Sequence, residues 1–147
     1  MGCGSAIAKE TDCVSRESGF DEKALRIFED IKSSLGIEFV PNMYLKLGAN
    51  PEYLESVWRN VRSLMGGTTR LDTRTKDIIA FTVSVMSGCE YCFSVYDAAL
   101  RHHWVDDETM LEIYRVIETY SGLNRLNIAM RTPADERPWF GCGGARA

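Results

Sequence analysis

The sequence contains no apolar run that approaches the roughly 18 residues needed to cross a membrane. It has no excess of positive charge either, since the formal net charge is -4 and the isoelectric point is near 5.2. An acidic protein repels phosphate backbones and anionic lipids, so we expect no nucleic acid and no membrane as partners. The N-terminus lacks the basic and apolar regions of a signal peptide. The chain has five cysteines, an odd number. These absences predict a protein of the reducing cytoplasm rather than a secreted disulfide scaffold.

Metal-ligating residues are equally scarce. Apart from one C-x-x-C pair, Cys89-Glu90-Tyr91-Cys92, the candidate ligands are the adjacent His102 and His103 and the near-terminal Cys3, Cys13 and Cys142. Zinc needs four ligands, usually from a second C-x-x-C or a spaced histidine pair, and no such pair exists here. The pattern therefore favours a redox-active dithiol, with no metal and no cofactor, over a structural zinc site. Buried, inert cysteines are the remaining interpretation.

Helical periodicity dominates the rest of the chain, and almost nothing indicates a strand. Caps and prolines predict helices over residues 21–35, 51–65, 73–87, 90–102 and 106–120, and a short helix after Pro41. We expect Ser121-Gly122 to loosen the last helix before residues 123–130. Residues 78–86 are apolar nearly all round, which predicts a helix buried on most sides. We expect an all-α domain over residues 21–131, between a mobile N-terminal arm (1–20) and an irregular tail (132–147).

Three segments carry a family resemblance. Ala49-Asn50-Pro51-Glu52, then Leu71-Asp72, then the stretch from Asp77 to Cys92 resemble the carboxymuconolactone decarboxylase superfamily, and within it the AhpD-like, alkylhydroperoxidase-type members. The resemblance covers roughly residues 21–130. The family signature is a glutamate, eleven residues, C-x-x-C, three residues and a histidine; this chain keeps the spacing but has Asp77 for the glutamate and Tyr96 for the histidine.

The resemblance implies an all-helical fold that assembles as a trimer or hexamer. It implies reduction of a small hydroperoxide or disulfide substrate, with Cys92 as the attacking thiol and Cys89 as the resolving thiol. Turnover would then need a thiol reductant, such as a thioredoxin-like or lipoyl partner. The decarboxylase branch lacks this dithiol, so its reaction is the less expected inheritance.

The spacing also suggests how the site would be built. If helices 73–87 and 90–102 form an antiparallel hairpin turning at Gly88, Asp77 lies about 16 Å and Tyr96 about 12 Å from the turn, roughly opposite each other. Cys92 and Tyr96 are four residues apart and share a helix face. A carboxylate, a middle group and a thiol would then line up as orienter, proton relay and nucleophile. Tyrosine titrates near 10 and is a poor base at neutral pH, so this relay would be degraded.

Each candidate residue also has a structural interpretation. Asp77 would suit the first turns of its helix, Tyr96 would serve as a core aromatic, and Tyr91, a candidate for substrate binding, would serve packing. The histidines lie near a helix C-terminus, where a cation is favoured, and His103 is too far along its helix from Cys92 for direct catalysis. Trp104 stands where many relatives carry a helix-ending glycine.

Two other functions stay open at this point. One is a non-catalytic thiol module that binds a soft metal or metalloid ion through Cys89, Cys92 and Cys142. The other is a purely structural oligomer with relict cysteines.

Overall fold

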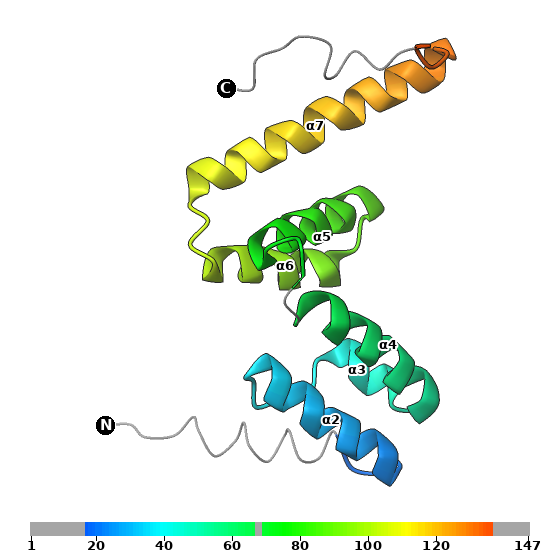
Figure 1. The fold of residues 1–147 in the computed structure, drawn as a ribbon, viewed down its shortest axis with the longest axis vertical. Coiled ribbons are helices and arrows are strands. Elements are labelled where there is room, and N and C mark those ends of the chain that lie inside the picture. The colour runs from blue at the N-terminus through cyan, green and yellow to red at the C-terminus, as the bar shows by residue number, and fades with distance from the viewer. Residues whose placement is uncertain (1–16, 67–68, 137–147) are drawn as a thin grey trace. The chain divides into compact units, whose positions relative to one another are not determined.

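The computed structural model describes residues 17–66 and 69–136, and these residues form helices and no strands. The elements are α2 (Glu22–Leu35), α3 (Asn42–Leu47), α4 (Pro51–Met65), α5 (Thr73–Ser87), α6 (Glu90–His102) and α7 (Asp107–Met130) (Figure 1). The predicted all-α fold class is thus confirmed. None of the helices in the described ranges combines the length and apolarity that a membrane span requires.

The helix ends follow from local chemistry. Four helices begin at an Asp or Asn whose side chain accepts a hydrogen bond from a backbone N–H of the first turn: Asp21, Asn50, Asp72 and Asp106. Two end at a glycine in the left-handed conformation, Gly36 (φ 66°) and Gly88 (φ 67°). A residue with a Cβ atom is strained at such an angle, so the glycines fix where α2 and α5 stop.

The chain divides into two compact units, one up to Leu71 and one from Asp72. In the first unit α2, α3 and α4 enclose a core of apolar side chains: Ala24, Phe28, Ile31, Val40, Tyr44, Leu54 and Trp58. Asp30 connects α2 to α4, because its carboxylate accepts hydrogen bonds from the indole N–H of Trp58 (2.7 Å) and the guanidinium of Arg62 (2.7 and 2.9 Å).

The second unit carries α5, α6 and α7. Its core consists of side chains from all three helices and the α6–α7 link: Phe81, Leu100, Val105, Met110 and Ile113. The aromatic ring of Phe81 contacts those of Phe93 on α6 (5.3 Å between centroids) and Tyr114 on α7 (5.9 Å). Phe81 is therefore the side chain around which the three helices pack.

Two details of the second unit differ from expectation. α7 runs unbroken through Ser121 and Gly122, because a glycine inside a long helix costs only about 1 kcal/mol relative to alanine and does not by itself end it. α5 is not buried on most sides in the isolated chain: Ile79, Val83 and Met86 are 50%, 60% and 53% exposed. The side chains of α5 that pack in the core are Ile78, Phe81 and Val85, so only one face of the helix lies against it.

Trp104 supplies the turn between α6 and α7 in a strained conformation. It is a non-glycine residue at φ 59°, and its side chain is 92% exposed. The next residue, Val105, donates its N–H to the carbonyl of Leu100 (3.1 Å), which closes the turn as a glycine would.

We expect Trp104→Gly to stabilise the protein by roughly 0.5–1 kcal/mol, because the exposed indole contributes little packing and glycine removes the left-handed strain. Thermal unfolding should show a melting temperature higher by about 2–4 °C. Trp104→Ala is the matched control, since it removes the indole but keeps the Cβ atom. An equal gain from Trp104→Ala would contradict the explanation.

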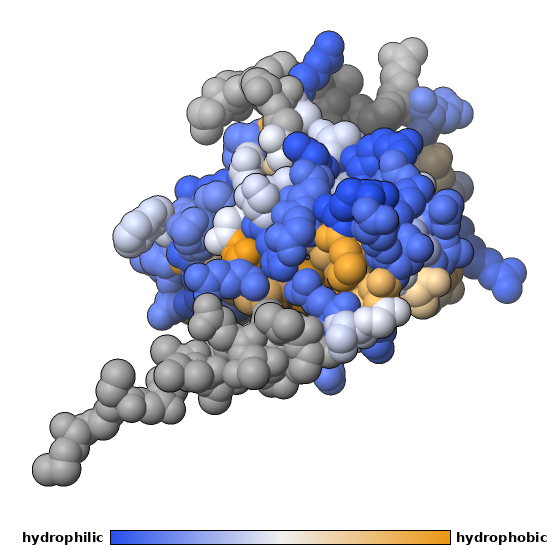
Figure 2. All heavy atoms as spheres, turned by 90° about the horizontal axis from the view of Figure 1, so that it is seen from below, coloured by the Kyte–Doolittle hydropathy of each residue, from blue (hydrophilic) through white to orange (hydrophobic). Residues whose placement is uncertain are grey.

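Large apolar side chains are exposed elsewhere in the second unit. The face shown in Figure 2 is mostly hydrophilic, with small hydrophobic areas between hydrophilic residues. On α5 and the C-terminal half of α7, however, large apolar side chains are about half exposed or more: Ile79, Val83, Met86, Leu123, Leu126 and Ile128. Apolar helix faces of this kind are typical of surfaces covered by another protein chain.

We therefore expect a homo-oligomer in which a second copy covers the apolar face of α5. Light scattering at micromolar concentration should give a mass that is a multiple of 16.6 kDa. Val83→Glu should lower that mass, because Val83 is 60% exposed in the isolated chain and a buried unpaired carboxylate opposes association. A wild-type mass of one chain would refute the expectation.

Candidate functional site

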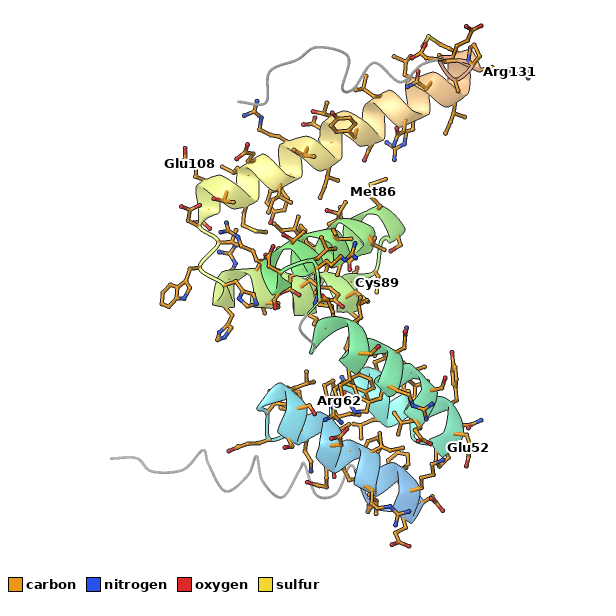
Figure 3. The ribbon with its side chains drawn as sticks, in the orientation of Figure 1. Glu52, Arg62, Met86, Cys89, Glu108 and Arg131 are labelled. Atoms are coloured by element: carbon orange, nitrogen blue, oxygen red, sulfur yellow. The ribbon has the colours of Figure 1, made fainter. Side chains whose placement is uncertain are left out.

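The two cysteines of the C-x-x-C pair lie at the start of α6, directly after the turn at Gly88. Cys89 is labelled in Figure 3. Cys89 is the N-cap residue of α6, and its sulfur accepts a hydrogen bond from the backbone N–H of Cys92 (3.3 Å). Both cysteines are free thiols, and both are partly buried. A sulfur in the capping position receives N–H donors that a serine or aspartate would otherwise receive.

This placement makes the two thiols unequal. A hydrogen bond from the Cys92 side chain lowers the pKa of Cys89, and backbone N–H groups of Cys92 and Tyr91 lower it further. The same hydrogen bond raises the pKa of Cys92, and burial adds to that increase. The thiolate of the reduced pair is therefore favoured on Cys89.

An open hollow of about 580 Å³ lies beside the capping sulfur. Its lining mixes apolar and polar side chains from the end of α5 and the first turns of α6: Ser84, Val85, Gly88, Cys89, Glu90, Phe93 and Ser94. The hollow includes Cys89 but not Cys92 among these residues. A small molecule that enters it contacts Cys89.

Asp77 is buried and paired, but its partner is His103. The Asp77 carboxylate, only 4% exposed, lies 3.1 Å from Nε2 of His103, the residue that ends α6. Burial raises the pKa of Asp77, while the charge and hydrogen bond of His103 oppose that rise. The pair ties the first turns of α5 to the end of α6, the opposite end of these helices from the dithiol.

The pairing of Asp77 with His103 was not predicted from the sequence, where the length of α6 only separates His103 from Cys92. Relative to Gly88, Asp77 lies eleven residues before the turn and His103 fifteen after it, a difference of four residues, or about 6 Å along the axes. This spacing allows His103 to lie opposite Asp77, but it does not favour His103 over Tyr96, which differs by three residues.

Tyr96 lies half-buried against the core of the second unit. Burial raises its pKa first, and the nearby negative charges of Cys92 and Asp77 raise it further. No hydrogen bond between Tyr96 and Asp77 occurs in the described part of the chain, where the carboxylate instead contacts His103. A phenol with a raised pKa stays protonated at neutral pH, so Tyr96 can donate a hydrogen bond but cannot take a proton from Cys92.

The other candidate residues have less to contribute. Tyr91 lies 39% exposed in the first turn of α6, and its side chain is not among those lining the hollow. Cys3, Cys13 and Cys142 fall outside the described residues. Within residues 17–66 and 69–136, no three His, Cys, Asp or Glu side chains gather as a metal site would require.

The described residues form an all-helical fold with a C-x-x-C pair at a helix start, and comparisons with known proteins agree with the fold. The sequence profile of the Carboxymuconolactone decarboxylase family matches residues 51–136, more than half of the chain. The crystal structure of the alkylhydroperoxidase AhpD core from Rhodospirillum rubrum superimposes with a TM-score of 0.74 and 31% identity, over 78% of this chain and 84% of that one. A search of curated proteins gave no match. The chain belongs to the carboxymuconolactone decarboxylase family and has the AhpD-like fold.

The Asp77–His103 pair should contribute to stability in a pH-dependent way. We expect His103→Leu to lower the free energy of unfolding by about 1–2 kcal/mol at pH 7, because it leaves a buried carboxylate without its donor. Since the folded-state pKa of Asp77 lies above its usual value of 3.8, folding favours the protonated carboxyl, and stability is lost as pH rises through that pKa. The defect of His103→Leu should accordingly shrink toward pH 4.

Denaturant unfolding of wild type and His103→Leu at pH 4 and pH 7 measures this effect. The matched control adds Asp77→Asn to the His103→Leu protein, since asparagine has the shape of the carboxyl without its charge. The double variant should recover part of the stability at pH 7 and none at pH 4. A defect of equal size at both pH values would show that the pair does not act through its charge.

Proposed function

We propose that this protein is a dithiol oxidoreductase that reduces small hydroperoxides and cycles between a Cys89/Cys92 dithiol and a disulfide. The observation that carries the proposal is the position of the pair: the backbone N–H of Cys92 lies 3.3 Å from the sulfur of Cys89, at the start of a helix, beside an open hollow. C-x-x-C pairs in this position close a small disulfide ring and favour the thiolate.

The net chemistry is balanced. The thiolate attacks the terminal oxygen of the hydroperoxide; an S–O bond forms, the O–O bond breaks, and the alcohol leaves after taking up a proton. The second thiol then attacks the resulting sulfenic acid. The S–S bond forms, the S–O bond breaks, and water leaves. A thiol reductant, thioredoxin-like or lipoyl-bearing, returns the disulfide to the dithiol by thiol–disulfide exchange.

The relatedness to alkylhydroperoxidase AhpD supports the peroxide substrate. The R. rubrum protein is an alkylhydroperoxidase by its description, and its core has 31% sequence identity to this chain. The family pattern gives attack to Cys92 and resolution to Cys89, with Asp77 and Tyr96 behind them. Either order of attack ends in the same disulfide, so the function does not depend on which sulfur reacts first.

We expect mild peroxide to convert Cys89 and Cys92 into an intramolecular disulfide that dithiothreitol reverses. Peptide mapping by mass spectrometry should find the linked pair in a background where Cys3, Cys13 and Cys142 are serine. Cumene hydroperoxide should be consumed catalytically once a suitable thiol donor is present, and a panel containing thioredoxin and dihydrolipoamide identifies that donor.

The matched control is the same background with both Cys89 and Cys92 changed to serine, which should consume no peroxide above the uncatalysed rate. Detection of only unlinked, over-oxidised cysteines in the parent protein, or of no reaction at all, would refute the proposed function.

A further inference from the structure

The two sulfurs of the dithiol differ in surroundings, and the difference runs against the family pattern. In that pattern a histidine four residues after the second cysteine assists the second cysteine as the attacking thiol. Here the position holds Tyr96, whose phenol stays protonated, and the buried carboxylate of Asp77 contacts His103 instead. Nothing among the described side chains therefore replaces the base behind Cys92.

Cys89, by contrast, has the features of an attacking thiol. Its sulfur occupies the N-cap of α6, receives the N–H of Cys92 at 3.3 Å, and lies at the positive end of the helix dipole. Cys89 is also one of the residues that line the hollow of about 580 Å³, and Cys92 is not.

We propose that Cys89, facing the hollow at the start of α6, is the sulfur that attacks the substrate, and that Cys92 is the resolving thiol. The inference rests on the proposed dithiol function and reverses the order that the family pattern implies. The directions of the two pKa shifts agree with it, since that of Cys89 is lowered and that of Cys92 is raised.

The first step under this assignment uses groups already in place. The Cys89 thiolate attacks the terminal oxygen of a hydroperoxide in the hollow, and the alkoxide that leaves takes a proton from the water that the open hollow admits. Cys92, which holds its proton while Cys89 is a thiolate, then loses that proton and attacks the sulfenic sulfur of Cys89, releasing water. The high pKa of Cys92 suits this later role, because it keeps the resolving thiol from competing for peroxide.

The lining of the hollow also points to the class of substrate. Val85 and Phe93 provide apolar lining, and the acidic residue Glu90 lines the hollow next to Cys89. A negative charge beside the attacking sulfur disfavours anionic substrates, so an uncharged organic hydroperoxide fits best.

Single-cysteine proteins separate the two assignments. In the background with Cys3, Cys13 and Cys142 changed to serine, Cys92→Ser leaves only Cys89, and Cys89→Ser leaves only Cys92. Serine at either position keeps a hydroxyl of similar size, and serine at position 89 can still cap α6. Each protein is mixed with cumene hydroperoxide, the sulfenic acid is trapped with dimedone, and the rate of its formation is measured from pH 5 to 9.

We expect Cys92→Ser to form sulfenic acid at a rate within about threefold of the first step in the two-thiol protein. Cys89→Ser should react at least roughly tenfold more slowly, because its remaining thiol lacks both the capping hydrogen bonds and the opening into the hollow. The pH of half-maximal alkylation by iodoacetamide should be lower for Cys89 than for Cys92. In Cys92→Ser, Glu90→Gln should reduce the preference for cumene hydroperoxide over an anionic fatty-acid hydroperoxide.

The outcomes are distinct. Faster reaction at Cys92 than at Cys89 would overturn the assignment while leaving the dithiol function intact. Equal rates would overturn it as well, since the two environments would then not matter. Disulfide formation in the two-thiol protein tests the function itself, and its absence would overturn both proposals.

Discussion

The left-handed turn at Gly88 is the constraint on which the second unit depends. At φ 67° it ends α5, reverses the chain and leaves the next residue, Cys89, in extended conformation at the N-cap of α6. A side chain with a Cβ atom would be strained there, although nothing lies within 4 Å of the position the Cβ would take. The backbone angle, rather than crowding, therefore requires glycine. From this turn follow the capping position of one thiol, the hydrogen bond between the cysteines and the packing of α6 along α5.

The two ends of the α5–α6 pair carry different groups of residues. Near the turn lie the sulfurs and the hollow; at the far end the buried Asp77–His103 pair joins the helices, and between them Phe81 and Leu100 fill the core. A buried carboxylate in an apolar layer is stable only with a partner, and His103 provides it from the last turn of α6. The same carboxylate stands at the position that the family resemblance assigns to a catalytic residue, and its contact with His103 also joins the two helices.

Much of the fold was readable from local sequence. The caps at Asp21, Asn50 and Asp106 and the glycines at positions 36 and 88 predict helix ends because each acts within one turn of the chain. Contacts between residues that are far apart in the sequence were not predictable in this way. The residue pattern of α5 predicts a helix that is apolar nearly all round, but it does not show which of its faces is covered by other helices of the same chain. Axial distances placed Asp77 near Tyr96, but only the rotation of each helix decides that the carboxylate contacts His103. The letters C-x-x-C do not distinguish the two thiols, whereas the N-cap position does.

The sulfur that caps α6 also links the oxidation state of the pair to the stability of the helix. Reduced Cys89 accepts backbone hydrogen bonds with growing strength as it loses its proton, whereas a disulfide sulfur carries no charge with which to do so. The fold thus stabilises the dithiol more than the disulfide. By the thermodynamic cycle that connects folding and reduction, a protein that stabilises its reduced form has a more oxidising disulfide. In the proposed cycle, a single hydrogen bond at the start of a helix would thus favour reduction of the disulfide by a thiol donor.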